Sequence, residues 1–413
     1  MVSFWEVGLV MNSVSIKTEF KSFLKIKGAR ILLIGIFLYG IGTGILAPMN
    51  AVYMRDEIGL SKLEIVSIFS ISLLLNMITT ILVGIISDKI KRKKPLPIFA
   101  CILCMAGLLI YMNATTYEVT LMGMVLAVAP SGLIMGQFFA MARNHFMTLA
   151  PDIYEMAQIW LRATLSIGFF SGLLVGANLY IIGNFNSVLW GNFLGYAALF
   201  VVLIFYREYG EPASVSSVKG EAFSLVMLLA LLLLACADSL RGLYLPLVVF
   251  QLFNEPQLMS YLWSIQAVFE LLFMTAAGYW ASKFGSKPVI MVGSFCALTT
   301  YIVYSVSPPL WVFFLVQPLY SFFVSVLYGV AMGYVQRMFN TRIGFGSSLY
   351  VFLSQTAALI GYILPFLIPG YHPRIFIIPS VLVCAAFLLM MGLFIIIRVR
   401  AKKDAHSIGT TGY

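Results

Sequence analysis

Long apolar runs, separated by short polar breaks, repeat along almost the whole chain. A helix that crosses a bilayer needs about 20 predominantly apolar residues, and the sequence contains twelve runs of that kind. They lie at 31–54, 63–87, 97–115, 119–142, 154–182, 187–206, 223–249, 258–282, 288–306, 310–336, 345–369 and 374–397. The pattern predicts an all-α membrane protein with twelve transmembrane helices.

A polar stretch divides the twelve runs into two sets of six. It reads REYGEPASVSSVKGEA, and its Gly, Pro and Ser residues discourage a continuous helix. We therefore predict five segments along the chain. They are a cytoplasmic N-terminal segment at 1–30, an N-terminal six-helix bundle at 31–206, a cytoplasmic linker at 207–222, a C-terminal six-helix bundle at 223–397 and a cytoplasmic tail at 398–413.

The composition agrees with lipid as the solvent of this chain. Charged residues make up 10 % of the sequence and hydrophobic residues 61 %, whereas a soluble protein carries roughly a quarter charged residues. A chain with so few polar side chains cannot cover itself against water. The lipid bilayer is therefore the expected partner of most of its surface.

The basic residues indicate how the helices are oriented. With both termini in the cytoplasm, 21 of the 26 Lys and Arg residues fall in cytoplasmic segments, as the positive-inside rule requires. Arg55, Lys62 and Arg374 fall outside. We expect a multi-pass protein of the cell membrane with both termini cytoplasmic. The net charge of +10 then reflects topology and anionic lipid rather than nucleic-acid binding.

Several function classes leave no trace in the sequence. There is no P-loop for ATP, and His145, His372 and His406 are far apart in the chain. The five cysteines all lie inside apolar runs. We expect no cofactor, no metal site and no enzymatic activity. A non-transporting membrane sensor built on a transporter scaffold is the alternative class.

Two short loops repeat at equivalent places in the two halves. GIISDKIKRKK begins at Gly84, near the end of the second run, and GYWASKFGSK begins at Gly278, near the end of the eighth. The first loop resembles the loop motif of the major facilitator superfamily, and the matching residues are Gly84, Asp88, Lys89 and Arg92. The resemblance implies that the aspartate caps or pairs with a facing helix end and holds a cytoplasmic gate.

Further stretches resemble the sugar efflux transporters within that superfamily. They are GQFFAMARNH from Gly136, LRATLSIGFFSG from Leu161, AVFELLFMTAAGYWASKFGSK from Ala267, and LVQPLYSFFVSVLYGVAMGYVQ from Leu315 followed by GFGSSLYVFLSQTAALIGYI from Gly344. The resemblance implies efflux of a sugar or glycoside. This chain departs from the group by lacking the Gly-Pro-Pro of the fifth helix, and by placing Asp238 and Arg241 where the group has neutral Asn and Tyr.

Ionisable side chains inside the apolar runs are candidates for function, because each costs about 3 kcal/mol at bilayer depth. Glu270 lies near the middle of the eighth run, one helical turn after Gln266. Burial favours the neutral form of such an acid, so Glu270 is the candidate proton carrier, with Asp238 as the second.

Asp238 and Arg241 are three residues apart, so their side chains can meet on one helix face. Two hypotheses stay open: a structural ion pair, or a pair that opens to grip a charged or zwitterionic substrate. Arg162 either contributes to a substrate site or extends toward the headgroups.

Polar side chains in otherwise apolar runs are further candidates for substrate binding, since each can bond a solute hydroxyl or another helix. They are Tyr39, Asn50, Gln137, Gln266, Gln317, Tyr320 and Gln355. From residues and resemblance together, we expect a monomeric secondary active transporter. It would couple protons to the efflux of a small polar solute, a sugar or glycoside. The alternative solute is a zwitterion such as an amino-acid-like metallophore.

Overall fold

The structure is a computed structural model that describes residues 23–87, 92–150, 154–208, 223–339 and 343–410. All regular elements in these ranges are helices. Contacts between residues divide the chain into two compact units. Unit 1 comprises Met1–Ala47 and Ile71–Val215, and unit 2 comprises Pro48–Ser70 and Ser216–Tyr413.

The helices of the first half follow the predicted apolar runs. They are α2 (Ala29–Leu46), α3 (Asn50–Asp56), α4 (Lys62–Ser87), α5 (Pro95–Met112), α6 (Tyr117–Val128), α7 (Ser131–Leu149) and α8 (Tyr154–Phe205). Proline at 48 and 130 stands at the two points where an apolar run is split into successive helices, as expected for a residue that lacks a backbone N–H.

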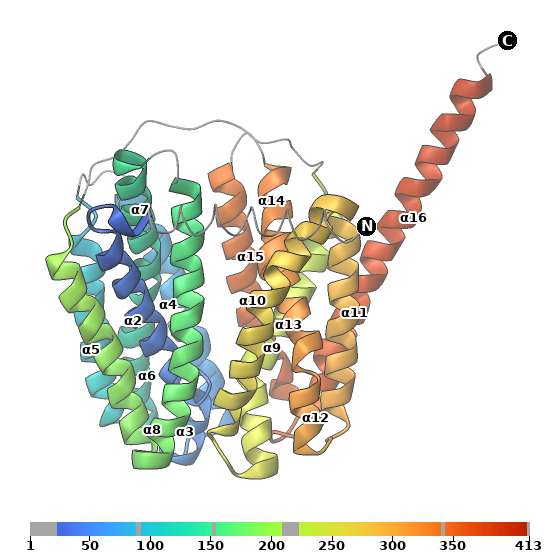
Figure 1. The fold of residues 1–413 in the computed structure, drawn as a ribbon. Coiled ribbons are helices and arrows are strands. Elements are labelled where there is room, and N and C mark those ends of the chain that lie inside the picture. Colours follow the sequence, from blue (N-terminus) through green and yellow to red (C-terminus); the bar gives the residue numbers. More distant parts are fainter. Residues whose placement is uncertain (1–22, 88–91, 151–153, 209–222, 340–342, 411–413) are drawn as a thin grey trace, which may run out of the picture. The chain divides into compact units, whose positions relative to one another are not determined.

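The helices of the second half are α9 (Leu225–Phe253), α10 (Leu258–Phe284), α11 (Ser286–Ser305), α12 (Leu310–Leu315), α13 (Gln317–Ser325), the π-helix η2 (Val326–Ala331), α14 (Met332–Met338), α15 (Ile343–Ile363), the 3-10 turns η4 (Leu364–Leu367) and η5 (Pro373–Phe376), and α16 (Ile377–Thr410). α12, α13, η2 and α14 together form the tenth predicted span. Figure 1 shows α16 extending well past the other helices of unit 2.

The prediction of twelve spanning helices is confirmed. Among the described residues, eleven helical segments are long and apolar enough to cross a membrane. One of these segments lies in α8, which is broken at Gly183 (φ −147°) and Asn184 (φ 54°, ψ −160°). The break divides α8 into the fifth and sixth predicted spans.

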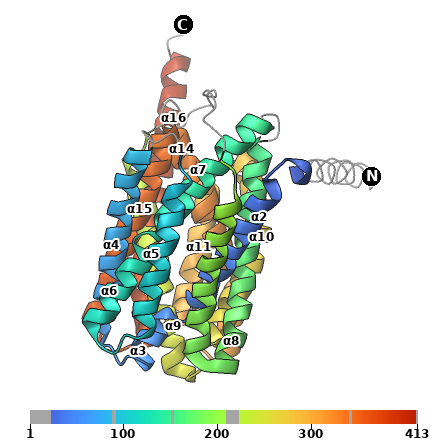
Figure 2. The same ribbon diagram turned by 90° about the vertical axis from the view of Figure 1, so that its left-hand side faces the viewer.

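Close backbone contact between α2 and α8 organises unit 1. An added Cβ at Gly168 or Gly172 would collide with the backbone carbonyl of Phe37 or Ile41. Gly176 continues the same row one turn further along α8. Small residues repeated every four positions let two helices approach closely inside a membrane. Figures 1 and 2 show α2 beside α8, and α5 against α6 and α7.

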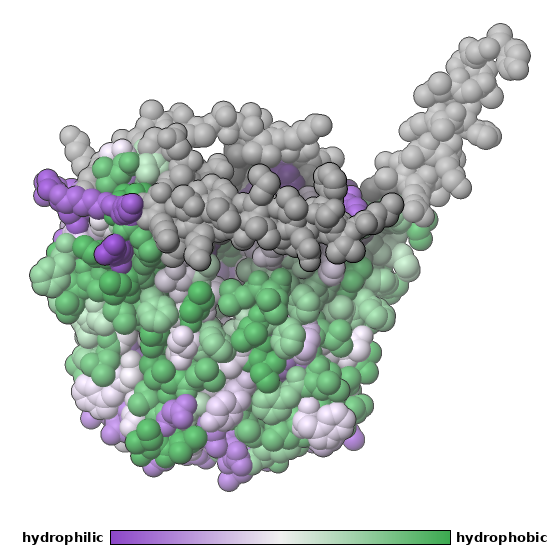
Figure 3. Space-filling view, viewed as in Figure 1, coloured by the Kyte–Doolittle hydropathy of each residue, from purple (hydrophilic) through white to green (hydrophobic). Residues whose placement is uncertain are grey.

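The outer surface is suited to lipid. Large apolar side chains are widely exposed, among them Ile182 at 82 %, Phe205 at 74 % and Leu225 at 70 %. On the face drawn in Figure 3, hydrophobic side chains form most of the described surface, and hydrophilic ones lie mainly at its upper left and along its lower edge. Exposed apolar area of this extent is incompatible with a water-facing surface, so the chain is a multi-pass membrane protein.

Candidate functional site

Arg241 of α9 lies at the centre of a polar cluster inside unit 2. Its side chain is 2 % exposed. Nη1 donates to Gln266 Oε1 on α10 at 2.7 Å, and Nη2 donates to Gln317 Oε1 on α13 at 3.1 Å. A buried charge needs such partners, because an unpaired one costs several kcal/mol. The planar guanidinium fork allows one side chain to bond two helices at once.

The Gln317 side chain is oriented by its own partners. Its Nε2 donates to the Tyr304 hydroxyl at 2.9 Å and to the Phe313 carbonyl at 2.8 Å. With the amide nitrogen engaged by these two acceptors, the amide oxygen faces Arg241. Gln317 is fully buried, and its assignment to the substrate site stays a prediction.

Tyr320 of α13 lies between Arg241 and Asp238. The Arg241 guanidinium carbon is 3.7 Å from the centre of the Tyr320 ring, which is a cation–π contact. The Tyr320 hydroxyl donates to Asp238 Oδ1, and the Tyr328 hydroxyl donates to Asp238 Oδ2 at 2.6 Å. Tyr320 therefore contacts both charges, and the two hypotheses for Asp238 and Arg241, a structural ion pair or a pair that opens for a substrate, stay predictions.

Glu270 of α10 belongs to the same cluster. Its carboxyl lies within hydrogen-bonding reach of Gln266 and close enough to Asp238 and Arg241 to interact with both electrostatically. Two acids and one buried arginine thus share a small volume on α9 and α10. Such a cluster can bind a proton or exchange hydrogen bonds with a solute.

Two serines of α13 donate hydrogen bonds to the backbone of α10 next to the cluster. Ser321 Oγ donates to the Gln266 carbonyl at 3.0 Å, and Ser325 Oγ donates to the Glu270 carbonyl at 3.1 Å. Both pairs are four residues apart, so one face of α13 is bonded in register to one face of α10. This contact fixes the height of Gln266 and Glu270 relative to Tyr320.

The members of the cluster differ in exposure. Arg241, Gln317 and Tyr320 are buried, whereas Asp238, Gln266 and Glu270 are half-buried and Tyr328 is 40 % exposed. The acids, the Gln266 side chain and Tyr328 are therefore partly exposed, while the Arg241 guanidinium is enclosed. Two buried donors, Arg241 Nε and Trp263 Nε1, find no hydrogen-bond partner in the described part of the chain.

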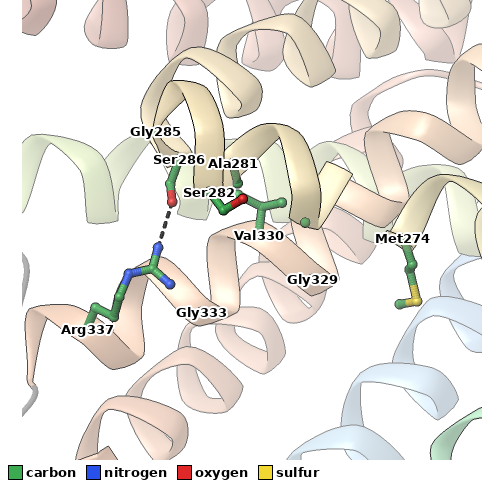
Figure 4. Close-up of a pocket in the computed structure, with 10 residues that line it drawn as sticks. Met274, Ala281, Ser282, Gly285, Ser286, Gly329, Val330, Gly333 and Arg337 are labelled. Carbon is green, nitrogen blue, oxygen red and sulfur yellow. Dashed lines mark hydrogen bonds between the residues drawn. The ribbon is translucent and has the colours of Figure 1, made fainter. Parts of the chain in front are cut away.

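A cavity of about 660 Å³ lies next to the cluster, between α10 and η2–α14. Its wall includes Met274, one turn after Glu270, and Gly329, directly after Tyr328. Figure 4 shows Met274 at one end of the cavity and Arg337 at the other. Arg337 donates a hydrogen bond to Ser286 Oγ at 2.6 Å. The cavity therefore reaches from the neighbourhood of the acids to the end of α10 that we predict to be cytoplasmic.

The predicted site residues are divided between the two units. Tyr39, Gln137 and Arg162 belong to unit 1 and are described there. Tyr39 packs edge-on against Tyr196, with ring centres 6.0 Å apart. Gln137 is buried with its Oε1 unpaired, and the exposed Arg162 lies 5.9 Å from the Phe139 ring.

Two further predicted residues also lie in unit 2. Asn50 is buried in α3, and Gln355 is half-buried in α15. Their assignment to the substrate site stays a prediction. Among the described residues, no group of three or more His, Cys, Asp or Glu side chains is placed to hold a metal ion.

The predicted gating motif lies largely beyond what the structure describes. Asp88 and Lys89 are outside the described residues, Gly84 lies within α4, and Arg92 is exposed. The role of these residues in a gate stays a prediction.

Sequence reasoning missed the tyrosines and serines that orient the cluster. Tyr304, Tyr328, Ser321 and Ser325 were not among the predicted site residues, yet each bonds a member of the cluster or its backbone. The only available signal was spacing, since Ser321 and Ser325 repeat every four residues along a helix that also carries Gln317.

Comparison with known proteins identifies the family of this chain. The family model described as Major Facilitator Superfamily matches residues 32–252, more than half of the 413 residues. Sugar efflux transporter B of Salmonella typhimurium is 22 % identical over 89 % of this chain and 94 % of its own length. Sugar efflux transporter C of Escherichia coli is 22 % identical over 82 % and 88 %.

Solved transporter structures share the fold. The nucleoside transporter NupG superposes with a TM-score of 0.71 at 14 % identity, covering 89 % of this chain and 98 % of NupG. A peptide transporter POT in complex with sulfate gives a TM-score of 0.74 at 15 % identity, covering 90 % and 94 %. From the matched family model, the twelve helices and these folds, we conclude that the chain belongs to the Major Facilitator Superfamily.

Proposed function

We propose that this transporter couples protons to the export of a small polar solute. The observation that carries the proposal is the pair of half-buried carboxylates, Asp238 and Glu270, on neighbouring helices beside the buried Arg241. Two adjacent carboxylates resist being charged at the same time. Both carboxylate oxygens of Asp238 already accept hydrogen bonds from tyrosine hydroxyls, so we assign the binding and release of the proton to Glu270.

A sugar or glycoside is the solute that fits the accessible groups best. The carboxylates of Asp238 and Glu270 and the amide oxygen of Gln266 accept hydrogen bonds, and the many hydroxyls of a sugar donate them. The relatives are named as sugar efflux transporters. These two facts support a sugar independently of each other.

The second candidate solute is a zwitterion such as an amino-acid-like metallophore. The observation in its favour is the unpaired Arg241 Nε, which is a free donor for a carboxylate. Because Arg241 is 2 % exposed, this solute would have to displace Gln266 or Tyr320 first. A sensor without transport is the remaining alternative, and any measured solute movement excludes it.

Glu270→Gln tests the proposal in reconstituted vesicles with labelled lactose as the probe. Glutamine keeps the shape and the hydrogen-bonding groups but cannot release a proton. We expect the wild-type protein to move lactose uphill when a pH gradient is imposed. The variant should lose at least about 90 % of this uphill movement while it still exchanges lactose between equal concentrations, because exchange needs no net proton transfer.

Glu255→Gln is the matched control, since Glu255 is an exposed acid just before α10. It should leave uphill movement unchanged. Uphill, pH-driven transport that survives in Glu270→Gln would assign the proton to another group. If no lactose moves but an amino-acid-like solute does, the zwitterion candidate replaces the sugar.

A further inference from the structure

Residues 48–70 have an unusual place in the chain. They pack as part of unit 2, but both of their ends continue directly into unit 1, at Ala47 and at Ile71. α4 crosses the second boundary without interruption. A rearrangement of unit 1 relative to unit 2 must therefore either leave this segment behind or pull it off its contacts. Which of these happens depends on how firmly the segment is held.

Arg55, in the last turn of α3, makes the first strong contact of this segment. Its guanidinium donates to the Leu247 carbonyl at 3.3 Å and to the Gln251 side chain, both on α9. Its Cζ lies 4.6 Å from the centre of the Tyr371 ring and 5.5 Å from that of Phe250. One cation therefore joins α3 to α9 and to the segment between α15 and α16.

Lys62, the first residue of α4, makes the second contact. Its ammonium donates to three backbone carbonyls, those of Pro365 at 2.8 Å, Ile368 at 2.6 Å and Gly370 at 3.0 Å. All three of its N–H donors are thus satisfied. Gly370, with φ 66°, adopts the left-handed conformation that favours glycine, and this turn helps the chain to wrap around the ammonium.

Tyr371 is shared by the two cations. Its ring lies 4.6 Å from Arg55 and 5.7 Å from Lys62. Burial raises the pKa of Tyr371 to about 12, so the ring stays neutral and attracts both cations through its π-face. Among the described residues, the hydrogen-bond acceptors and aromatic rings that Arg55 and Lys62 contact are all neutral.

Neutral partners make these contacts reversible. Arg55 and Lys62 are half-buried, so water can replace carbonyl and ring contacts when the segment moves away. Release then leaves no unpaired buried anion behind, which is the large cost of breaking a buried ion pair. Lys62 lies roughly 14 Å along α4 from Ile71, where unit 1 resumes. A small tilt of α4 at Ile71 therefore displaces the Lys62 end of the helix further than the Ile71 end. A tilt of α4 with unit 1 would draw its ammonium out of the carbonyls.

We propose that Arg55 and Lys62 form a latch, which holds residues 48–70 on unit 2 at the predicted outer side and releases once in each transport cycle. The latch rests on the proposed transport function. Its release exposes α3, which is buried against α9 in this structure. The sequence assigns three basic residues to the outer side, and the third, Arg374, is exposed and has no part in the latch.

Thiol labelling tests the release without any solute. The reporter is a cysteine at Ala51, which is 4 % exposed in α3, in a chain whose native cysteines are replaced by alanine. An impermeant thiol reagent is applied from outside. Arg55→Met and Lys62→Met should each raise the labelling rate about tenfold or more, since each removes hydrogen bonds from a charged donor. Arg374→Met, the matched control, should leave the rate unchanged within about twofold.

Cross-linking separates a latch from a permanent brace. Cysteines at Arg55 and Gln251 are joined by a short bifunctional thiol reagent, and lactose movement is measured before and after reduction of the link. We expect the link to stop uphill transport and reduction to restore it. Full transport with the link in place would overturn the latch, as would equal labelling rates in Lys62→Met and Arg374→Met. Faster labelling without any lactose transport would instead count against the proposed function alone.

Discussion

At the scale of single residues, Tyr320 has the most consequential position. Its ring lies under the Arg241 guanidinium while its hydroxyl bonds Asp238. The Tyr320 side chain thus stabilises both the positive charge of Arg241, through its ring, and the negative charge of Asp238, through its hydroxyl. In this arrangement Asp238 stays partly exposed and Arg241 is enclosed.

The two functions of Tyr320 can be separated by substitution. Tyr320→Phe removes the hydroxyl but keeps the ring, and it should lower stability by about 1 kcal/mol. Tyr320→Leu removes the ring as well, and it should cost about 2 kcal/mol more because the guanidinium loses its cation–π contact. Thermal unfolding in detergent should rank wild type, Phe and Leu in that order. An equal effect of both variants would show that the ring contact contributes nothing.

At the scale of helices, different residue types hold neighbouring helices together in the two units: serines in unit 2 and glycines in unit 1. In unit 2, Ser321 and Ser325 bond the backbone of α10 and set the register of the site. In unit 1, Gly168 and Gly172 let α8 contact the backbone of α2. Because lipid supplies no hydrophobic force between helices, close packing and hydrogen bonds between helices have to hold them together.

Gly172→Ala tests the contact between α2 and α8. The added methyl group would collide with the Ile41 backbone carbonyl, so we expect a loss of about 1–3 kcal/mol in stability. Gly136→Ala is the matched control, because a Cβ there meets nothing within 4 Å. That variant should be neutral or more stable by up to about 1 kcal/mol. Thermal unfolding of the two variants checks the difference, and equal midpoints would refute the close contact.

At the scale of the whole molecule, the basic residues predict the orientation in the membrane. With 21 of 26 Lys and Arg residues assigned to one side, the linker and both termini should face the cytoplasm. Single cysteines at Ser217 and Ser407 should therefore resist an impermeant thiol reagent in intact cells. Thr115→Cys, in an exposed turn on the predicted outer side, should react readily. Labelling of Ser217→Cys and Ser407→Cys with protection of Thr115→Cys would reverse the orientation.

The sequence alone determined the spanning helices and singled out the charged residues that the structure places in one cluster. Hydrophobic length fixes where a helix can cross a bilayer, so runs such as 154–182 and 187–206 were recognisable even though one helix, α8, covers both. The cost of a charge at bilayer depth singled out Asp238, Arg241 and Glu270 by residue type, without knowledge of their neighbours.

Only the tertiary structure decided how these residues are connected. Spacing along one helix predicts that Asp238 and Arg241 can meet, but it says nothing about a tyrosine from another helix that enters between them. The same holds for Lys62, whose ammonium finds its carbonyls about 300 residues later in the chain. Periodicity reports which face of a helix is polar, whereas packing between helices distant in sequence selects the partner.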